Sequence, residues 1–318
     1  MPNLLKQAML YESPATLPVS ANLLPAAWMK YGAELQRLVD QYPQFFGGRK
    51  VDLDHIGNIT PASYHAGSFA DEWGCVWTNI DAGMESIVTG HPIQTEDDIR
   101  NLMIPPNKDG RIPHGFMYLR LLDLCGFEFA MSLFAEEGEE IQMLIDKVLE
   151  YNCIQIEAVG DFGEIAYFGD DLGMQNSLAI GPERWRKYMK PCFKKMYDIA
   201  KSKRKDALVY MHTDGCIWEI MPDLVECGVD MLNPQYRSNG LDNLVRVCKG
   251  KIPINLDLDR QLFPFATRSE LFDHVGECVE SLYLPAGGLG LNIEFNYEIP
   301  LENMAAVLDA AEKYRFYK

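Results

Sequence analysis

Short apolar segments alternate with helical patterns throughout the second half of this 318-residue chain. The apolar segments are of the length and composition of buried strands, and each is followed by a stretch with helical spacing of apolar residues. The predicted strands are residues 165–168, 207–211, 229–234, 252–257 and 288–295. This alternation predicts a parallel sheet that is covered by helices.

The number of strand–helix units suggests how such a sheet is arranged. Five units follow residue 160, and the preceding residues have room for three more. Eight units in a chain of this length predict an α/β fold of the (β/α)8 TIM-barrel type. We expect one domain over residues 1–318, with residues 1–60 as an N-terminal segment and helix. A doubly wound open sheet is the alternative, but no predicted strand is followed by a G-x-G-x-x-G or Walker loop.

Less regular patterns in the rest of the chain give further expectations. Strands are predicted over residues 17–23 and 116–122, and helices over residues 28–42, 136–157 and 181–203. Pro191 lies inside the last of these helices. Because proline lacks an N–H and clashes with the preceding turn, it predicts a kink or a break there.

Polar side chains stand at the end of each of the five predicted strands. They are Asp170 and Asp171, His212 and Asp214, Asn233 and Gln235, Asp257 and Asp259, and Asn292 and Glu294. In a barrel the carboxyl ends of all strands surround one mouth, where barrel enzymes have their active sites. Such residues also satisfy backbone groups at strand ends, which is the structural alternative. Five pairs in succession favour a metal site or an acid–base site.

The pair His212 and Asp214 is the centre of this expectation. Residues two apart on a strand point to the same side, so the imidazole and the carboxylate project together. A mixed set of histidine and carboxylate ligands suits Zn²⁺, with Mn²⁺ or Fe²⁺ as alternatives. The expected metal ligands are His212, Asp214, Glu294 and Asp170, with Cys216 as a further candidate.

Candidate catalytic and substrate-binding residues surround this expected metal site. Asp71 lies next to Trp73 and Trp77, and apolar surroundings raise the pKa of a carboxyl group. Either Asp71 or Asp171 is expected to act as general acid or as a hydrogen-bonding group for the substrate, although Asp71 also fits a solvated turn. Aromatic side chains near the mouth would suit a ring-shaped substrate or serve as rim packing. The expected substrate-binding residues are Tyr64, Trp73, Tyr167, Asn233 and Gln235.

Composition excludes several classes of function. The formal net charge of −17 argues against a nucleic-acid partner, which requires a basic surface. No apolar run approaches the roughly 20 residues that span a bilayer, and residues 1–16 lack a signal-peptide pattern. The eight cysteines are scattered without a C-x-x-C pair, as expected of buried thiols in a reducing compartment. We therefore expect a cytoplasmic protein without a membrane partner.

Several of these segments together carry a family resemblance. They are D-E-W-G-C-V-W (71–77), F-G-D-D-L-G (168–173), G-P-E-R-W-R-K-Y-M-K-P (181–191), H-T-D-G (212–215), P-D-L-V-E-C-G-V-D-M-L-N-P (222–234) and I-P-L-E-N (299–303). Over residues 60–315 the chain resembles the uroporphyrinogen decarboxylase superfamily. That superfamily contains the decarboxylase and the cobalamin-dependent methyltransferases, and the resemblance implies a (β/α)8 barrel.

The decarboxylase branch fits this chain less well. Its N-terminal M-R-Q-A-G-R-Y segment, in which arginine binds substrate carboxylates, has no counterpart in residues 1–50. A substrate with many carboxylates needs cationic partners, preferably arginine. The catalytic aspartate of that branch would correspond to Asp71 in F-A-D-E (69–72).

The methyltransferase branch fits better. Its members hold zinc with an H-x-C motif and a distal cysteine, where this chain has His212-x-Asp214 and Asn292 to Glu294. Carboxylate in place of thiolate makes a harder metal, which is better suited to polarising an oxygen. The resemblance therefore implies transfer of a methyl group from a small O-methyl donor, such as a methoxylated aromatic compound, to a corrinoid protein.

The same resemblance implies the cofactors and partners. Zinc is the expected metal, and cobalamin would be carried by the partner corrinoid protein, because this chain has no D-x-H-x-x-G motif. The alternatives are a decarboxylase-like lyase and a metal-free barrel that binds a corrinoid or another small ligand. A homodimer is left open.

Overall fold

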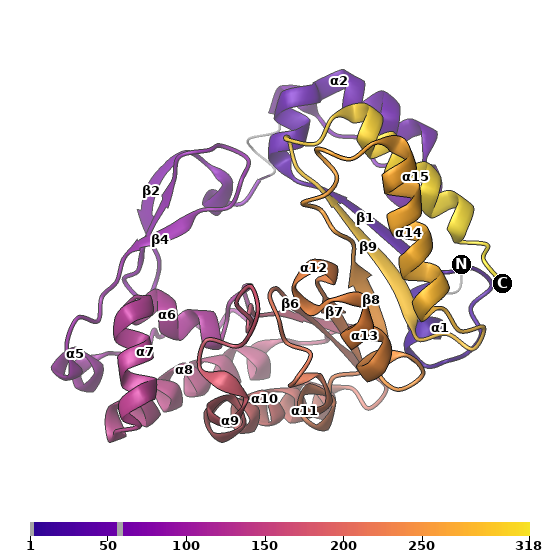
Figure 1. The fold of residues 1–318 in the computed structure, drawn as a ribbon. Coiled ribbons are helices and arrows are strands. Elements are labelled where there is room, and N and C mark those ends of the chain that lie inside the picture. The colour runs from indigo at the N-terminus through magenta and orange to yellow at the C-terminus, as the bar shows by residue number, and fades with distance from the viewer. Residues whose placement is uncertain (1–2, 56–59) are drawn as a thin grey trace. The chain divides into compact units, whose positions relative to one another are not determined.

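The computed structural model describes residues 3–55 and 60–318 (Figure 1). The chain forms two compact units. Unit 1 consists of Met1–Ser68, Trp77–Ile87 and Gly240–Lys318, and unit 2 consists of Phe69–Val76 and Val88–Asn239. Most of the residues that were predicted to form the functional site belong to unit 2.

Unit 1 contains three parallel strands in the order β1-β9-β8. The strands are β1 (Val19–Leu23), β8 (Ile254–Asp257) and β9 (Leu289–Phe295). The helices are α1 (Leu4–Met9), α2 (Pro25–Gln41), α3 (Pro43–Phe46), α13 (Leu241–Cys248), α14 (Arg268–Leu282) and α15 (Leu301–Tyr314). Helices α14 and α15 lie side by side (Figure 1). Apolar residues of β9, among them Leu291 and Ile293, are fully buried in the core of this unit.

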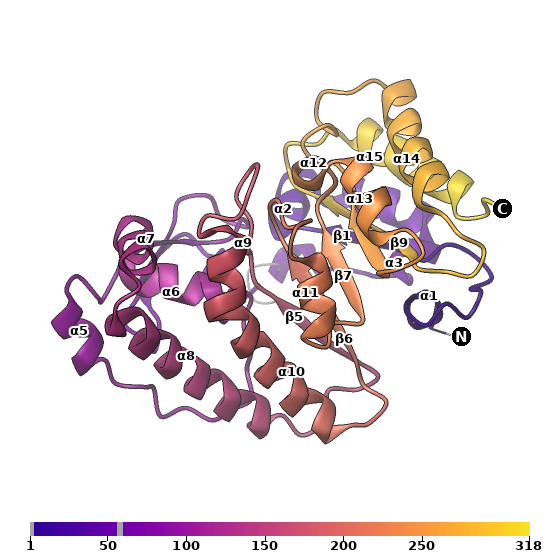
Figure 2. The same cartoon turned by 60° about the horizontal axis from the view of Figure 1, so that its bottom comes forward.

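Unit 2 contains three parallel strands in the order β7-β6-β5. The strands are β5 (Ile165–Gly169), β6 (Leu208–Thr213) and β7 (Met231–Pro234). The helices are α5 (Glu96–Asn101), α6 (Tyr118–Cys125), α7 (Phe127–Glu136), α8 (Glu139–Ala158), α9 (Gly181–Arg184), α10 (Lys190–Lys203), α11 (Met221–Glu226) and α12 (Tyr236–Asn239). Helices α8 and α10 run side by side (Figure 2).

An aromatic core joins β5 of unit 2 to its helices. The ring of Phe168 on β5 lies 5.1 Å from that of Tyr197 on α10 and 5.6 Å from that of Phe116. Phe193 on α10 contacts both Phe116 and Trp185. Because side chains alternate along a strand, the residues next to Phe168 point to the opposite face of the sheet. That opposite face carries Tyr167, Tyr210 and His212.

Shorter elements lie between the main strands and helices. The strands β2 (Gly67–Ala70), β3 (Val76–Asn79) and β4 (Ile87–Gly90) form a small sheet in the order β2-β3-β4. Short 3₁₀ turns occupy Leu53–His55 and Ala62–Tyr64. No helix in the described ranges has the length and apolar character that a membrane crossing requires.

The predicted parallel α/β arrangement is confirmed. All five strands expected after residue 160 are present as β5 to β9, and the strand expected over residues 17–23 is β1. Six strands thus pair in parallel within the two units as far as the chain is described. The interruption expected near Pro191 is also present, because one turn of π-helix, Trp185–Met189, separates α9 from α10. Proline cannot donate the hydrogen bond that would continue a regular α-helix.

The strand predicted over residues 116–122 is wrong, because most of this segment belongs to helix α6. Tyr118, Leu121, Leu124 and Cys125 are buried, and their spacing of three and four residues places them on one helix face. The helix has no side-chain cap from its own N-cap residue, Met117. Its first N–H groups are instead bound by a carboxylate that directly follows β5 in the same unit, a contact that local sequence patterns cannot reveal.

We predict that Phe193→Ala lowers the free energy of unfolding by about 3–5 kcal/mol, the usual cost of removing a buried aromatic ring. Phe193 is fully buried, whereas Phe265 is 88% exposed and provides the matched control. Phe265→Ala should change the free energy of unfolding by less than about 0.5 kcal/mol. Urea unfolding followed by circular dichroism measures both. Equal midpoints for the two variants would contradict the described core.

Candidate metal centre

The loops that follow β5 and β6 continue the pairing of these two strands. The N–H of Asp170 donates to the carbonyl of His212 at 3.1 Å, and that of Gly173 donates to the carbonyl of Asp214 at 3.2 Å. Gly215 has a φ of +85°, and a Cβ at this position would lie 2.1 Å from the carbonyl oxygen of Gly173. Glycine is therefore required where the two backbones meet. This contact brings Asp171 alongside His212 and Asp214.

Two imidazoles and two carboxylates converge at these strand ends. His114 Nε2 lies 3.2 Å from Asp171 Oδ1, and His212 Nε2 lies 3.8 Å from the same oxygen. His212 Nε2 also lies 3.3 Å from Asp214 Oδ1. The ligand atoms of His114, Asp171 and His212 all lie within 4.8 Å of one another. All four side chains are partly accessible to solvent, so a small ligand can reach them.

Asn233 sets the orientation of the His212 ring. The strand register places Asn233 on β7 directly beside His212 on β6, and its Oδ1 lies 2.7 Å from His212 Nδ1. An amide oxygen only accepts hydrogen bonds, so Nδ1 carries the proton. Nε2 then faces the two carboxylates. Histidines that bind metals usually donate their second ring N–H to such an oxygen.

The electrostatics of the cluster show how strongly it attracts positive charge. Burial by itself lowers the pKa of His212, but the hydrogen bond and charge of Asp214, aided by Asp171 and Asn233, raise it to about 9. Burial also lowers the pKa of His114, yet the hydrogen bond and charge of Asp171 raise it overall. Burial would raise the pKa of Asp171, but His114 and the Asp214 N–H lower it. The protons carried by the two imidazoles thus balance the charge of the ionised carboxylates here, and a divalent cation could take over that role.

Gln235 and Asn239 hold the turn after His212. Gln235 Oε1 accepts a hydrogen bond of 2.9 Å from the N–H of Gly215. Asn239 Nδ2 donates to the carbonyl of Gly215 at 3.1 Å, and its Oδ1 accepts from the N–H of Ile217 at 2.9 Å. Gln235, which was predicted to bind substrate, therefore contacts the loop that carries Asp214.

Asp170 and Cys216, two further candidates, are buried in unit 2. The Asp170 carboxylate is fully buried and accepts hydrogen bonds from the N–H groups of Met117, Tyr118 and Leu119 at 3.2, 2.5 and 3.0 Å. It thus binds the start of α6. The thiol of Cys216 is buried, which raises its pKa and keeps it protonated.

Asp71 and Trp73 of unit 2 make contacts of their own. Asp71 Oδ2 accepts a hydrogen bond of 2.6 Å from the buried Arg120, and its Oδ1 accepts from the N–H groups of Trp73 and Cys75. Trp73 is buried, with its ring 5.0 Å from that of Tyr151. These contacts hold a turn against α6.

Tyr64 and Glu294 belong to unit 1. Glu294 on β9 accepts a hydrogen bond of 2.5 Å from Arg260 Nη1. Burial, followed by the charges of Glu85 and Glu294, raises the pKa of Tyr64 to about 12, so its hydroxyl stays protonated. The structure thus gathers Asp171, His212 and Asp214 with Asn233 in unit 2, whereas Glu294 forms an ion pair in unit 1.

Tyr167 of unit 2 lies on the same sheet face as His212. It is 61% exposed, and its ring centroid lies 5.1 Å from that of Tyr210 on the neighbouring strand. Both tyrosines precede the strand ends where the cluster lies. They provide an aromatic surface on the face that carries the histidine.

His114 is the member of the cluster that sequence reasoning missed. It lies in the loop before α6, in the segment I-P-H-G (112–115), outside any predicted strand. Its sequence neighbours are a proline and a glycine, which are typical of turns and carry no sign of a ligand. Only the close approach of this loop to the end of β5 brings His114 to Asp171.

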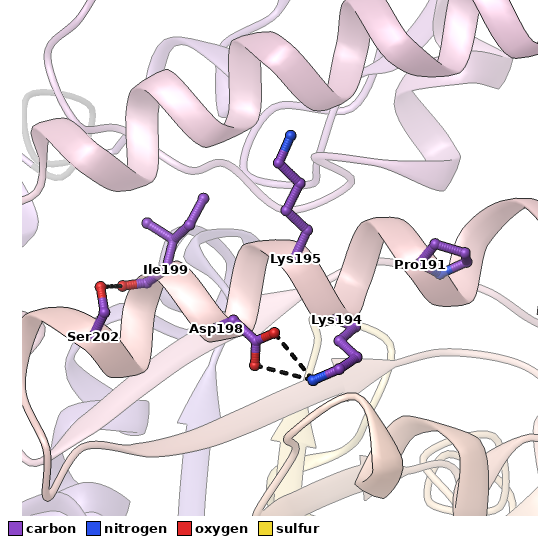
Figure 3. A pocket seen from close by; sticks show the side chains of 6 residues that line it. All are labelled: Pro191, Lys194, Lys195, Asp198, Ile199 and Ser202. Carbon is purple, nitrogen blue, oxygen red and sulfur yellow. Dashed lines mark hydrogen bonds and ion pairs between the residues drawn. The ribbon is translucent and has the colours of Figure 1, made fainter.

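A separate surface hollow lies along α10 (Figure 3). It measures about 520 Å³ and is lined by Pro191, Lys194, Lys195, Asp198, Ile199 and Ser202. Lys194 forms an ion pair with Asp198 at 3.0 Å. Its lining comes from a single helix and includes none of the clustered histidines and carboxylates, so we place the candidate site at the strand ends instead.

The fold is that of an α/β enzyme family. The chain belongs to the uroporphyrinogen decarboxylase (URO-D) family, because the pattern that defines this family matches residues 120–314, more than half of the chain. This confirms the resemblance predicted from the sequence. No curated protein sequence matches the chain significantly.

A solved structure supports the same fold. A methyltransferase from Methanosarcina mazei has a TM-score of 0.62 and 16% sequence identity, and the alignment covers 98% of both chains. At this identity the likeness shows a shared fold. A psychrophilic glycoside hydrolase family 10 endo-beta-1,4-xylanase aligns with a TM-score of 0.38, 8% identity and coverage of 92% of this chain and 89% of its own, which is too weak to support an argument.

We predict that Gly215→Ala lowers the free energy of unfolding by at least about 2 kcal/mol, through strain at positive φ and a clash with the Gly173 backbone. Gly181 is the control, because its φ is +73° but a Cβ there meets no atom within 4 Å. Gly181→Ala should therefore cost only about 1 kcal/mol. Thermal unfolding of both variants measures the difference in stability. Equal losses of unfolding free energy would show that the contact with Gly173 contributes nothing to stability.

Proposed function

We propose that the protein is a metal-dependent methyltransferase that moves a methyl group from a small O-methyl donor to a corrinoid protein. The observation that carries this proposal is the cluster of His114, Asp171 and His212, whose ligand atoms lie within 4.8 Å of one another. Membership of the URO-D family and a fold shared with a methyltransferase support it.

The donor set fits a divalent metal of intermediate hardness. Two imidazole nitrogens and a carboxylate oxygen would hold Zn²⁺, and the same set suits Fe²⁺ or Mn²⁺. Asp214 is a second carboxylate within reach of His212 Nε2. The proposed ligands therefore keep His212 and Asp214 from the sequence prediction and add Asp171 and His114. A bound Zn²⁺ would supply Lewis acidity that stabilises negative charge on a departing oxygen.

The side chains of unit 2 would orient the donor for this reaction. The exposed Tyr167 and the neighbouring Tyr210 offer a surface on which an aromatic donor could stack. Asp171 has a lowered pKa, so it suits a ligand better than a general acid. The methyl group would leave as a formal cation and bond to Co(I), which supplies the electron pair. The donor oxygen keeps the electrons of the broken C–O bond and takes up a proton.

The proposal includes the complete (β/α)8 barrel as one domain over residues 1–318. The alternation of parallel strands with helices in both units supports it, as does the family to which the chain belongs. Cobalamin would be bound by the partner protein, with its cobalt presented to the strand ends that carry His212.

We predict that the protein purified without added metal contains close to one zinc ion per chain. Asn233→Ala should weaken Zn²⁺ binding by about 10- to 100-fold, because His212 loses the partner that orients it. Asn101 is the control: it is an exposed helical residue whose amide binds a backbone carbonyl on its own helix. Competition with a chelator measures the affinities. Absence of zinc together with unchanged affinity in Asn233→Ala would contradict the metal site.

A second prediction concerns the reaction itself. Methoxylated aromatic compounds, screened with the protein and a Co(I) corrinoid protein, should include donors that convert Co(I) to methyl-Co(III), which absorption spectroscopy detects. His212→Ala should slow this conversion by at least about 100-fold, because several kcal/mol of charge stabilisation are lost.

Two further assays, of carbon dioxide release from uroporphyrinogen and of corrinoid binding, separate the rival functions. Release of carbon dioxide from uroporphyrinogen without a metal requirement would replace the proposal with a decarboxylase-like lyase. Tight binding of a corrinoid without any methyl transfer would instead indicate a protein that binds the corrinoid without catalysing a reaction.

A further inference from the structure

Three consecutive residues at the end of β5 contact the segment that carries His114. They are Gly169, Asp170 and Asp171, and the opposing segment is 114–119. The N–H of Gly115 donates to the carbonyl of Gly169 at 2.9 Å, so the two segments also meet through their backbones. All of these residues belong to unit 2. Each of the three residues makes a different contact.

Gly169 leaves room for the imidazole ring of His114. A Cβ at residue 169 would lie 2.6 Å from His114 Cδ2, which is closer than any real contact between carbon atoms. The backbone of Gly169 is not in the left-handed region, so alanine could adopt its conformation. The three atoms nearest to such a Cβ all belong to the imidazole ring of His114.

Asp170 binds the backbone just beyond His114. Its fully buried carboxylate accepts hydrogen bonds from three successive N–H groups, those of Met117, Tyr118 and Leu119. A carboxylate at a helix N-terminus satisfies donors that have no partner within the helix. This bond links α6, and the loop before it, to the residue next to Asp171 in the chain.

From these contacts we infer that Gly169 and Asp170 are positioning residues that hold the His114 imidazole against Asp171. The inference rests on the proposed function, because His114 and Asp171 are proposed metal ligands. Asp170 fixes the backbone that follows His114, and Gly169 leaves the space that the ring occupies. In the sequence G-D-D (169–171), Gly169 thus leaves space for the imidazole, Asp170 binds the backbone after it, and Asp171 is the proposed metal ligand.

The test uses Co²⁺ as a probe in the full-length protein. Gly169→Ala and Asp170→Asn are each made alone and together with His114→Ala. Gly160→Ala is the control, because a Cβ at Gly160 meets no atom within 4 Å. Co²⁺ affinity and the visible absorption of bound Co²⁺ are measured well below the unfolding temperature of each variant. The imidazole cross-peaks of the metal-free proteins are recorded by NMR, with that of His114 assigned from its absence in His114→Ala.

We expect each substitution to lower the affinity for Co²⁺, and we expect this effect to disappear when His114 is absent. Gly169→Ala and Asp170→Asn should each weaken Co²⁺ binding at least tenfold and change its absorption spectrum, as His114→Ala does. In the His114→Ala background, either second substitution should change the affinity less than twofold. A double-mutant cycle of this kind separates an effect through His114 from a general loss of structure. Gly160→Ala should bind Co²⁺ like the unsubstituted protein.

Two results would overturn the inference, and they differ from failure of the proposed function. In metal-free protein the His114 cross-peak should move in Gly169→Ala and in Asp170→Asn, while those of the exposed His55 and His65 stay in place. An unmoved His114 cross-peak refutes the inference whether or not metal binds. Losses of affinity that add to that of His114→Ala refute it as well. If the unsubstituted protein binds no Co²⁺, the metal site fails, and the NMR shifts alone decide the positioning role.

Discussion

The buried carboxylate of Asp170 is the interaction on which the rest of the candidate site depends. It binds three backbone N–H groups at the start of α6, a helix that has no side-chain cap of its own. A buried carboxyl group is tolerated only when such donors satisfy it, so this link between the end of β5 and α6 is costly to break. Because Asp171 follows in the chain and His114 precedes α6, the same link brings a carboxylate and an imidazole from distant parts of the sequence together.

Backbone hydrogen bonds beyond the ends of β5 and β6 bring the remaining residues of the candidate site together. The loops after β5 and β6 remain hydrogen-bonded, and the contact between Gly173 and Gly215 allows them to approach closely. Asp214 and Asp171 are thereby both placed near Nε2 of His212, whose ring Asn233 orients. The carboxylates of Asp214 and Asp171 raise the pKa of His212, and the same two carboxylates make the site suitable for a divalent cation.

Much of this site could be predicted from the positions of polar residues after apolar strands. The carboxyl ends of neighbouring parallel strands lie at one edge of a sheet, so Asp171, His212, Asp214 and Asn233 were expected to meet. The prediction assigned Asp170 as a metal ligand and Asp171 as a general acid or a group that binds the substrate, whereas in the structure it is Asp171 that lies beside His114 and His212. Alternation along the chain separates them: Asp171 reaches the face of His212, whereas Asp170 points to the helices. His114 lies in a turn, where no periodic pattern reports the direction of a side chain.

The sequence by itself determined the order of strands and helices after residue 160, the family and the polar character of the strand ends. These properties depend on local periodicity and on motifs, which can be recognised in the amino-acid sequence without knowledge of the fold. The tertiary structure alone decided that residues 116–122 belong mainly to a helix, that Asp170 binds the backbone of that helix, and that His114 joins the cluster. Each of these depends on contacts between residues about 50 or more positions apart in the chain. The physical reason is that a buried carboxylate selects its N–H partners by proximity in space, which local sequence does not encode.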